Sequence, residues 1–433
     1  MVDSGLLETF LAAIQASLSV LLVMLYGGIA AWMNILTPAN TKAVSKICVQ
    51  MFLPALLITK IGSELHSGSA GRYAIVLLWA VVCHLVSFVF GVIARRGFGM
   101  PDWTTAAVMF NNTTSYPLLL IAVLEETGVL NALVVGNETS SAAVERAKSY
   151  FLVFATVSHC LTFAIGPRLI NSGHAPEPDK SDNDDEVDAE PTENTGLLRP
   201  GASPYTRHSH SSFLLSTRRP TQKPTPTRRP ALIPKKRWAR LGLRSKWWLI
   251  FVSDFLNAPL LGALVGALIG LTPPLHRAFF NPTEDSGIFT AWLTASLKNI
   301  GGLFVTLPVV VAGGNPTRDL QNENRQNGNQ TKIRAPILFI LVTRFVLWPL
   351  LSIGTIYLLA SHTSLLGRDP MLWFALMLMP TGPPATTLVT LVQVSGASEE
   401  EKSISRILGM SYLVSPILSL TVVGSLRASQ ASI

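Results

Sequence analysis

One polar stretch decides the fold: Asn111-Asn112-Thr113-Thr114-Ser115-Tyr116-Pro117, in the middle of an apolar run from Trp103 to Leu124. A helix inside a lipid bilayer cannot leave its backbone N–H and C=O groups unpaired. Here five side chains that can bond the backbone in non-helical ways come before a proline. The proline removes an N–H donor and clashes with the turn before it. The sequence therefore predicts a helix that breaks near the middle of the membrane.

A second stretch of this kind lies in the other half of the chain. It reads Met379-Pro380-Thr381-Gly382-Pro383-Pro384-Ala385-Thr386-Thr387, again inside an apolar run. Two interrupted spans at corresponding positions of two halves are the best sequence indication of a transporter's substrate site.

The composition is that of a membrane protein. Of 433 residues, 48% are hydrophobic and 14% are charged, whereas a soluble domain carries about 25% charged residues. The apolar residues form runs of roughly 20 or more, the length of a membrane-spanning helix. The net charge of +8 lies mostly in loops, which argues against nucleic-acid binding. Cys48, Cys83 and Cys160 fall inside apolar runs, so we expect three buried thiols rather than disulfides.

We predict an all-α integral membrane protein with ten transmembrane helices. The predicted spans are 7–35, 43–61, 73–94, 103–124, 150–170, 247–271, 288–313, 335–360, 371–394 and 405–426. Five spans (residues 1–170) precede a long polar segment (171–246), and five follow it (247–433). Because each half has an odd number of spans, the halves are expected to be two inverted five-helix repeats.

Basic residues in the loops predict the orientation, because cytoplasmic loops carry an excess of Lys and Arg. One set of loops holds Lys42, Lys46, Arg95, Arg96, Arg318, Arg325, Lys332, Arg334, Lys402 and Arg406; the other holds Lys60, Arg72, Arg146, Lys148, Arg277 and Arg368. The first set is expected in the cytoplasm, which places both termini outside or in the lumen. The sequon at Asn137 then faces the lumen, where it is either glycosylated or unused.

The segment 171–246 is acidic from Glu177 to Glu193, and basic and rich in Pro, Ser and Thr from Arg199 onward. Such a composition cannot bury enough apolar surface to fold, so we expect a disordered cytosolic loop. Its basic end next to the sixth span favours an anionic cytoplasmic leaflet. A solvated tether is a simpler interpretation than a regulatory segment.

The two breaks predict an anion site. The second half of each broken helix begins with free N–H groups and a partial positive charge. Two such ends meeting near the midplane would bind a carboxylate-type anion together with asparagine amides. The expected binding residues are Asn111, Asn112, Thr113, Thr114, Pro117, Pro380, Thr381, Pro383, Pro384 and Thr387. The alternative is a pair of proline kinks whose asparagines hold helices together.

Several motifs in order carry a resemblance to a known family. Asn112-x-x-x-x-Pro117 followed by Leu-Leu-Leu-Ile resembles the crossover motif of the auxin efflux carrier superfamily, especially its PIN-LIKES branch. Similar matches begin at Asn257-Ala258-Pro259 in the sixth span, Gly301-Gly302 in the seventh and Arg344-Phe345-Val346-Leu347-Trp348-Pro349 in the eighth. The resemblance covers all ten predicted spans but not the long loop.

The resemblance implies a ten-helix inverted-repeat carrier with two crossed, proline-broken helices. Such a carrier exports or compartmentalises auxin-like organic acids and is often a homodimer. It favours the endoplasmic reticulum membrane over the plasma membrane. One departure from the family pattern is Pro384, which stands where an asparagine usually follows the ninth-span proline. The second half of the site then offers backbone groups and threonines, which leaves indole-3-acetate itself open as a substrate.

Other polar residues argue against coupling and catalysis. His84 and His159 lie near the middle of two spans, and we interpret them as packing residues rather than proton carriers. No Asp or Glu lies in the middle of a span. The sequence has no H-E-x-x-H, G-x-S-x-G or phosphate-binding glycine loop, so we expect no enzyme, no ATP-driven pump, no metal and no cofactor.

The favoured function is a secondary carrier for small organic anions that works by alternating access, as the two repeats rock about the crossing. The second hypothesis is a non-transporting membrane receptor or scaffold that signals through the long loop. Transport by liposomes that contain only the purified protein separates the two.

The orientation gives the first testable prediction. A protease added to sealed vesicles whose non-cytoplasmic face points outward should leave residues 171–246 intact, since the basic loops place this segment in the cytosol. Antibody detection of the uncut chain measures this, with detergent-opened vesicles as the control. Cleavage of the segment in sealed vesicles would overturn the orientation.

Overall fold

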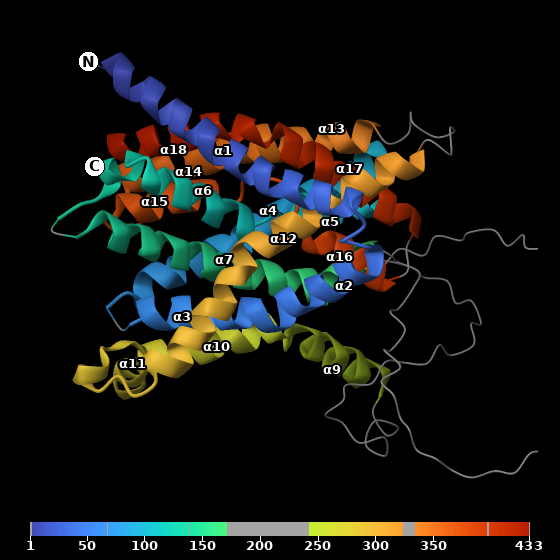
Figure 1. The fold of residues 1–433 in the computed structure, drawn as a ribbon. Helices are drawn as coiled ribbons and strands as arrows, with labels where there is room; N and C mark the ends of the chain where they lie inside the picture. Colours follow the sequence, from blue (N-terminus) through green and yellow to red (C-terminus); the bar gives the residue numbers. More distant parts are fainter. Residues whose placement is uncertain are drawn as a thin grey trace, which may run out of the picture.

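The computed structural model describes residues 2–66, 68–136, 138–170, 242–323, 334–395 and 398–432. Within these ranges every regular element is helical, and one isolated β-bridge joins two segments (Figure 1). The α-helices are α1 (Val2–Trp32), α2 (Pro38–Ile47), α3 (Leu53–Glu64), α4 (Ala70–Phe98), α5 (Asp102–Met109), α6 (Ser115–Glu126), α7 (Ser140–Ile170), α9 (Leu243–Phe255), α10 (Ala258–Leu271), α11 (Pro273–Phe280), α12 (Ala295–Glu323), α13 (Arg334–Val342), α14 (Trp348–His362), α15 (Pro370–Leu378), α16 (Thr387–Ser395), α17 (Ser398–Val414) and α18 (Leu418–Ala431). Most of the predicted cytosolic loop and the sequon residue Asn137 lie outside the described residues.

In the part of the chain that the structure describes, seven helices are long and apolar enough to cross a membrane: 8–32, 39–64, 70–98, 140–166, 290–314, 335–362 and 403–431. They correspond to the first, second, third, fifth, seventh, eighth and tenth predicted spans, so a helical membrane protein is confirmed. Short π-helical turns at Cys48–Phe52 and Thr343–Leu347 join α2 to α3 and α13 to α14. The other three predicted spans are each divided into shorter helices.

The sixth predicted span is divided where a continuous helix was expected. α9 ends at Phe255, and Asn257 caps a new helix, α10, by accepting a hydrogen bond from the Leu260 N–H at 3.0 Å. Pro259 follows in the first turn, where its missing N–H costs nothing. A further bend of 104° then separates α10 from α11. An asparagine followed by a proline is a helix-start signal, and here it overrides the apolar pattern.

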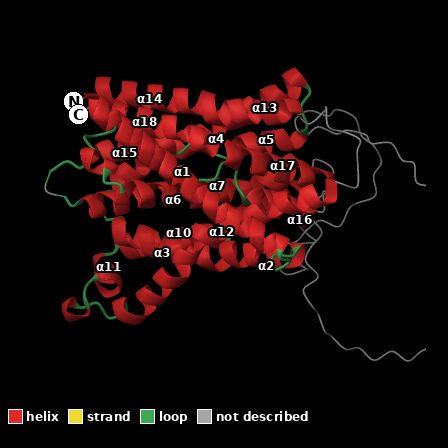
Figure 2. Ribbon diagram, turned by 45° about the horizontal axis from the view of Figure 1, so that its top comes forward, coloured by secondary structure: helices red, strands yellow, loops and turns green. Residues whose placement is uncertain are grey.

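The helices pack in two groups. The first group contains α1, α3, α10 and α12: α10 lies along α3, α1 lies along α12, and α12 also contacts α3. The second group contains α4, α5, α7, α14, α15, α16 and α18, which contact one another in turn. In Figure 2, α3, α10 and α12 lie together in the lower half of the molecule, and α4, α14 and α18 lie in the upper half. The two groups meet where α6, α7, α17 and α18 contact α1, α3 and α12.

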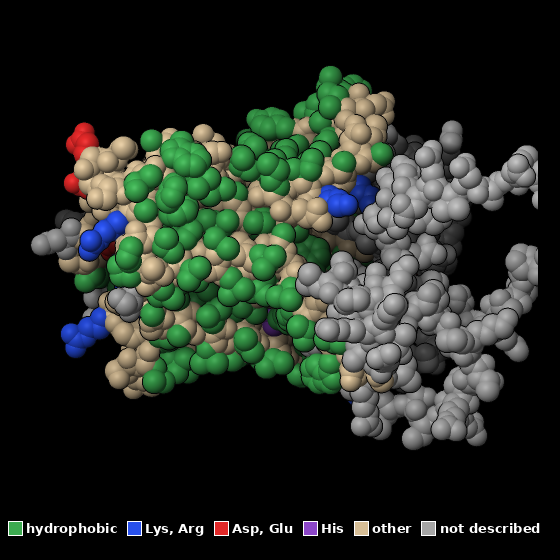
Figure 3. Space-filling view, turned by 90° about the horizontal axis from the view of Figure 1, so that it is seen from below, with side chains coloured by type: hydrophobic (Ala, Val, Ile, Leu, Met, Phe, Trp, Pro, Cys, Tyr) green, Lys and Arg blue, Asp and Glu red, His purple; other side chains and the backbone are tan. Residues whose placement is uncertain are grey.

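The outer surface is apolar in the middle and charged at the ends. Figure 3 shows hydrophobic side chains over the central part of the visible face, with Lys, Arg, Asp and Glu only toward its two ends. The start of α1 and the end of α18 lie at one end of the bundle, and the end of α7 and the start of α9 lie at the other (Figure 1). This distribution is the one expected for a protein whose middle contacts lipid.

A charged cluster fixes the start of α15. Asp369 accepts a hydrogen bond from the Leu372 N–H at 3.2 Å and so caps this helix. The same carboxylate pairs with Arg72 of α4 and Arg146 of α7, each at 3.3 Å, and accepts a bond from the Tyr150 hydroxyl at 3.2 Å. Only 11% of the Asp369 side chain is exposed. One side chain thus joins three helices of the second group.

Glycines allow the close contact between α10 and α3. A Cβ atom on Gly262 would lie 2.6 Å from the Cα of Pro54, and one on Gly266 would lie 2.9 Å from the Leu57 carbonyl oxygen. These neighbours are backbone atoms, which cannot move aside without shifting the helix. The glycines at four-residue spacing therefore form a backbone-to-backbone contact, as in other membrane helix pairs.

Substitution at this contact tests the packing. Gly262→Ala should destabilise the protein by about 1–3 kcal/mol, because the added methyl group forces α10 away from α3. Gly354→Ala in α14 is the matched control, since a Cβ there meets nothing within 4 Å. Thermal unfolding in detergent, followed by helix content, gives the comparison. Equal melting temperatures for the two variants would contradict the assignment.

Candidate functional site

The two interrupted spans meet at their breaks. α5 ends at Met109 and α6 begins at Ser115, while α15 ends at Leu378 and α16 begins at Thr387. Between them, Asn111 and Pro384 form an antiparallel bridge. The Asn112 N–H donates to the Pro383 carbonyl at 2.8 Å, and the Ala385 N–H donates to the Phe110 carbonyl at 2.9 Å. The unwound backbones thus satisfy each other where no water can do so.

The pairing pattern explains how Pro384 is accommodated. Both bridge hydrogen bonds come from the neighbours of the facing residues, so the missing N–H of Pro384 is not needed. Gly382 has a φ of 99°, a conformation that favours glycine. The Pro-Thr-Gly-Pro-Pro order therefore fits an unwound strand-like segment rather than a simple kink.

Asn111 holds the crossing together. Its Nδ2 atom donates to the carbonyls of Met379 and Thr381, each at 2.8 Å, and 4% of the residue is exposed. Other side chains take the remaining carbonyls at the end of α15: Trp79 donates to Leu376, Ser352 to Met377, Thr381 to Leu378 and Arg344 to Pro380, at 2.9, 2.6, 2.7 and 3.1 Å. The sequence analysis assigned the Asn111 amide to the substrate, whereas the structure uses its donors within the protein.

Asn112 organises the start of α6. Its Oδ1 atom accepts from the N–H groups of Thr114 and Tyr116 at 3.3 and 3.4 Å. Its Nδ2 atom donates to the Tyr412 hydroxyl at 2.5 Å. A side-chain cap of this kind holds the first turn of a helix in place. Asn112 thus keeps the interrupted backbone open.

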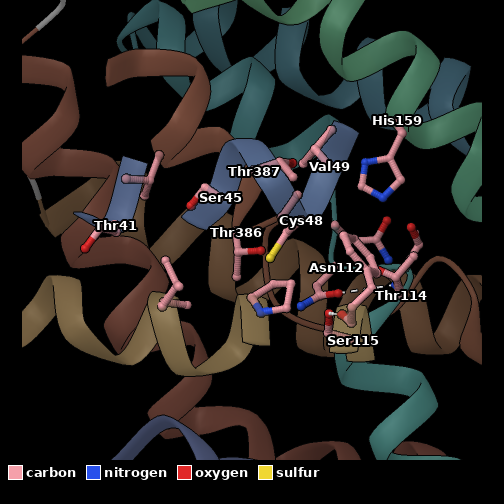
Figure 4. A pocket seen from close by; sticks show the side chains of 18 residues that line it. Thr41, Ser45, Cys48, Val49, Asn112, Thr114, Ser115, His159, Thr386 and Thr387 are labelled. Carbon is pink, nitrogen blue, oxygen red and sulfur yellow. Dashed lines mark hydrogen bonds between the residues drawn. The ribbon is translucent and has the colours of Figure 1, made fainter. Parts of the chain in front are cut away.

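A cavity of about 580 Å³, including its mouth, lies at the crossing. One wall comes from α2 and the turn after it (parts of 41–49) and from α12 (parts of 304–312). The other wall comes from residues 111–115, residues 385–389 and His159 of α7. Figure 4 shows Asn112, Thr114, His159, Thr386 and Thr387 around this cavity. The cavity therefore lies between the first and second helix groups.

A second, smaller cavity of about 300 Å³ lies on the other side of Asn112. Tyr116, Pro117, Thr381 and Gly382 are among the residues that line it. Asn112 lines both cavities. The two spaces are thus separated by the crossing itself.

The larger cavity contains polar atoms without a protein partner. The Thr387 hydroxyl and both ring nitrogens of His159 are buried and make no hydrogen bond within the described ranges. His159 packs beside Phe304, with ring centroids 6.3 Å apart. His159 thus both packs beside an aromatic ring, as the sequence analysis expected, and lines the cavity. His84 fits the packing role better, because it bonds the Ala80 carbonyl at 2.7 Å and packs on Phe154.

The predicted binding residues divide by position. Those on the larger cavity are Asn111, Asn112, Thr113, Thr114 and Thr387; Pro117 and Thr381 line the smaller one. Pro380, Pro383 and Pro384 line neither and contribute their backbone to the crossing. The described residues contain no group of three or more potential metal ligands.

Sequence reasoning missed Arg344. It is 1% exposed and donates to the Pro380 carbonyl behind the crossing. The sequence analysis used Arg344 only as part of a motif. An ionisable residue inside an apolar run is a functional candidate by default, and that signal could have singled it out.

Comparison with known proteins gives the family. The sequence model of a family described as membrane transport protein matches residues 12–423. The chain belongs to this family. It is the auxin efflux carrier family that the motifs resemble, and it is a family of membrane transporters rather than enzymes.

Relatives of the chain include fungal and plant members of this family. An uncharacterized transporter of Schizosaccharomyces pombe is 23% identical over 93% of this chain and 91% of its own length. An uncharacterized transporter of Saccharomyces cerevisiae is 22% identical over 96% of this chain and 95% of its own. The PIN-LIKES 5 protein of Arabidopsis thaliana is 30% identical over 40% of this chain and 39% of its own.

The free hydroxyl of Thr387 gives a direct test of the cavity. Thr387→Val keeps the side-chain shape but removes the hydroxyl, so it should weaken ligand binding about 3- to 10-fold, the value of one hydrogen bond. Thr162→Val in α7 is the matched control, because the Thr162 hydroxyl bonds the Ser158 carbonyl at 2.7 Å away from the cavity. Calorimetry on purified protein measures the ligand affinity of both variants. Equal affinity in the two variants would remove Thr387 from the site.

Proposed function

We propose that this protein is a secondary carrier for small organic anions of the auxin-like carboxylate class, working by alternating access. The observation that carries the proposal is the position of the larger cavity. It lies between the two helix groups, at the point where the two interrupted spans pair. Carrier sites are typically found where such discontinuous helices meet.

The chemistry of the lining favours an anion. Residues 113–115 and 385–389 include the first turns of α6 and α16, whose N–H groups carry a partial positive charge. No described residue that lines the cavity is an Asp or a Glu. The hydroxyl of Thr387 and the ring of His159 add unpartnered polar atoms. A carboxylate would face the positive ends of two helices and no acidic side chain among the described lining residues.

The shape and apolar part of the lining favour a compact acid with a flat ring. Phe304 and His159 lie edge to face, and Pro308, Val311 and Ala312 continue the apolar wall. An aromatic carboxylate would pack its ring on this wall with its charge toward the helix starts.

The proposal includes the architecture expected from the sequence. We propose ten membrane spans in two inverted repeats, residues 1–170 and 247–433, with 171–246 as a cytosolic connection. The pairing of two interrupted helices, one from each half, supports this arrangement. An endoplasmic reticulum location and a homodimer are further parts of the proposal and rest on family resemblance.

Transport by the purified protein tests the function. Proteoliposomes should take up at least one labelled acid from a panel of acetate, benzoate, phenylacetate and indole-3-acetate. Uptake should proceed equally in sodium and in potassium buffers, because no described cavity residue is a carboxylate that could hold a coupling sodium ion. Liposomes without protein are the control. Absence of uptake for the whole panel would favour the receptor or scaffold hypothesis, and strict sodium dependence would contradict the uncoupled mechanism.

A further inference from the structure

Arg344 is the largest fully buried side chain in the described part of the protein. It lies in the π-helical turn Thr343–Leu347 between α13 and α14, a type of irregularity that is frequent at functional sites. Its Nη1 atom donates to the Pro380 carbonyl at 3.1 Å. Its Nε and Nη2 atoms are buried and make no hydrogen bond within the described ranges.

The guanidinium charge is not neutralised by a described carboxylate. The ion pairs found for described residues include those of Lys60, Arg72, Arg95, Arg146 and Lys148, and none of them involves Arg344. The titratable neighbours of Arg344 are Cys83 and His84 of α4, which carry no negative charge. A buried charge without a partner is strongly unfavourable. An anion bound nearby would relieve this cost.

Arg344 is connected to the larger cavity through the crossing. Pro380, which it binds, stands between Met379 and Thr381, whose carbonyls both accept from Asn111. Asn111 in turn lines the cavity. The guanidinium is therefore connected to the cavity through the backbone around Pro380 and the side chain of Asn111.

The place that Arg344 occupies is also informative. Carriers driven by Na⁺ or H⁺ coordinate the cation with unwound backbone carbonyls and with the negative C-terminal ends of half-helices. Pro380 lies two residues after the end of α15, so its carbonyl is such a group. In this protein the guanidinium of Arg344, a cation fixed in the chain, binds that carbonyl.

We propose that Arg344 is a charge-selecting residue, a permanent cation behind the crossing that favours monoanionic ligands and takes the place of a coupling ion. The inference rests on the proposed function. It assigns charge selection to a residue that touches the ligand site only through Pro380 and Asn111, so Arg344 acts as a positioning residue. Its contribution is then specific for the ligand's charge and not for its shape.

An acid and its neutral amide test this assignment. Calorimetry should show that the wild-type protein binds phenylacetate more tightly than phenylacetamide; if another acid of the panel is taken up better, that acid and its amide are used. Arg344→Gln should weaken binding of the acid at least about fivefold, because the attraction between the guanidinium and the carboxylate is lost. Binding of the amide should change less than about twofold, and Arg344→Lys should restore most of the affinity for the acid.

Ser352→Ala is the matched control. It removes another hydrogen bond to the same helix end, from Ser352 to the Met377 carbonyl at 2.6 Å, without changing charge. It should therefore affect acid and amide equally. If Arg344→Gln does not assemble, the affinities of the wild-type protein and of Arg344→Lys for the acid and the amide decide. Equal wild-type affinities for acid and amide, or loss of the preference for the acid in Arg344→Lys, overturn the inference.

The outcomes separate the two proposals. If the wild-type protein binds and transports an acid but Arg344→Gln weakens acid and amide alike, the charge-selecting role is wrong and the carrier function stands. If the wild-type protein neither binds nor transports any acid of the panel, the carrier function and the role of Arg344 are both wrong.

Discussion

The site depends on how the backbone is satisfied where two helices stop inside a membrane. A helix end leaves its last carbonyls unpaired, and hydrocarbon offers no replacement for them. Here the end of α15 is completed by side chains from α4, α14, the turn before α14 and the break of the first interrupted span. The two unwound segments complete each other through two backbone hydrogen bonds. Because these bonds satisfy the interrupted backbone, the starts of α6 and α16 can lie next to a cavity.

The described residues that line the cavity include no Asp, Glu, Lys or Arg. Their titratable side chains are those of Cys48 and His159. In the proposed anion site, affinity would come from helix dipoles, hydroxyls and charges placed outside the lining. A ligand would then use the polar atoms of Thr387 and His159, which have no protein partner within the described residues.

Both helix breaks were predicted from the sequence, and there are physical reasons why other features of the site were not. The Asn-Asn-Thr-Thr and Pro-Thr-Gly-Pro-Pro stretches predicted both breaks, because polar residues next to proline disfavour a continuous helix. The contacts of Asn111 and the place of His159 on the cavity wall were not predictable, since they depend on which face of a segment meets the partner element. The division of the sixth span was missed because its apolar run hid the cap at Asn257. Asp369 and Arg344 act through contacts with residues far away in sequence.

The double hydrogen bond of Asn111 has a mechanical consequence. One amide group holds carbonyls on both sides of Pro380, and the backbone bridge ties the same two segments again. The two interrupted helices are therefore cross-linked by four hydrogen bonds and cannot separate without breaking buried contacts. Any change of exposure from one face of the membrane to the other has to carry both breaks together, as one body sliding or turning against α3 and α12. The cavity residues that belong to the two breaks would then move together. Only the wall formed by α2, the turn after it and α12 would change.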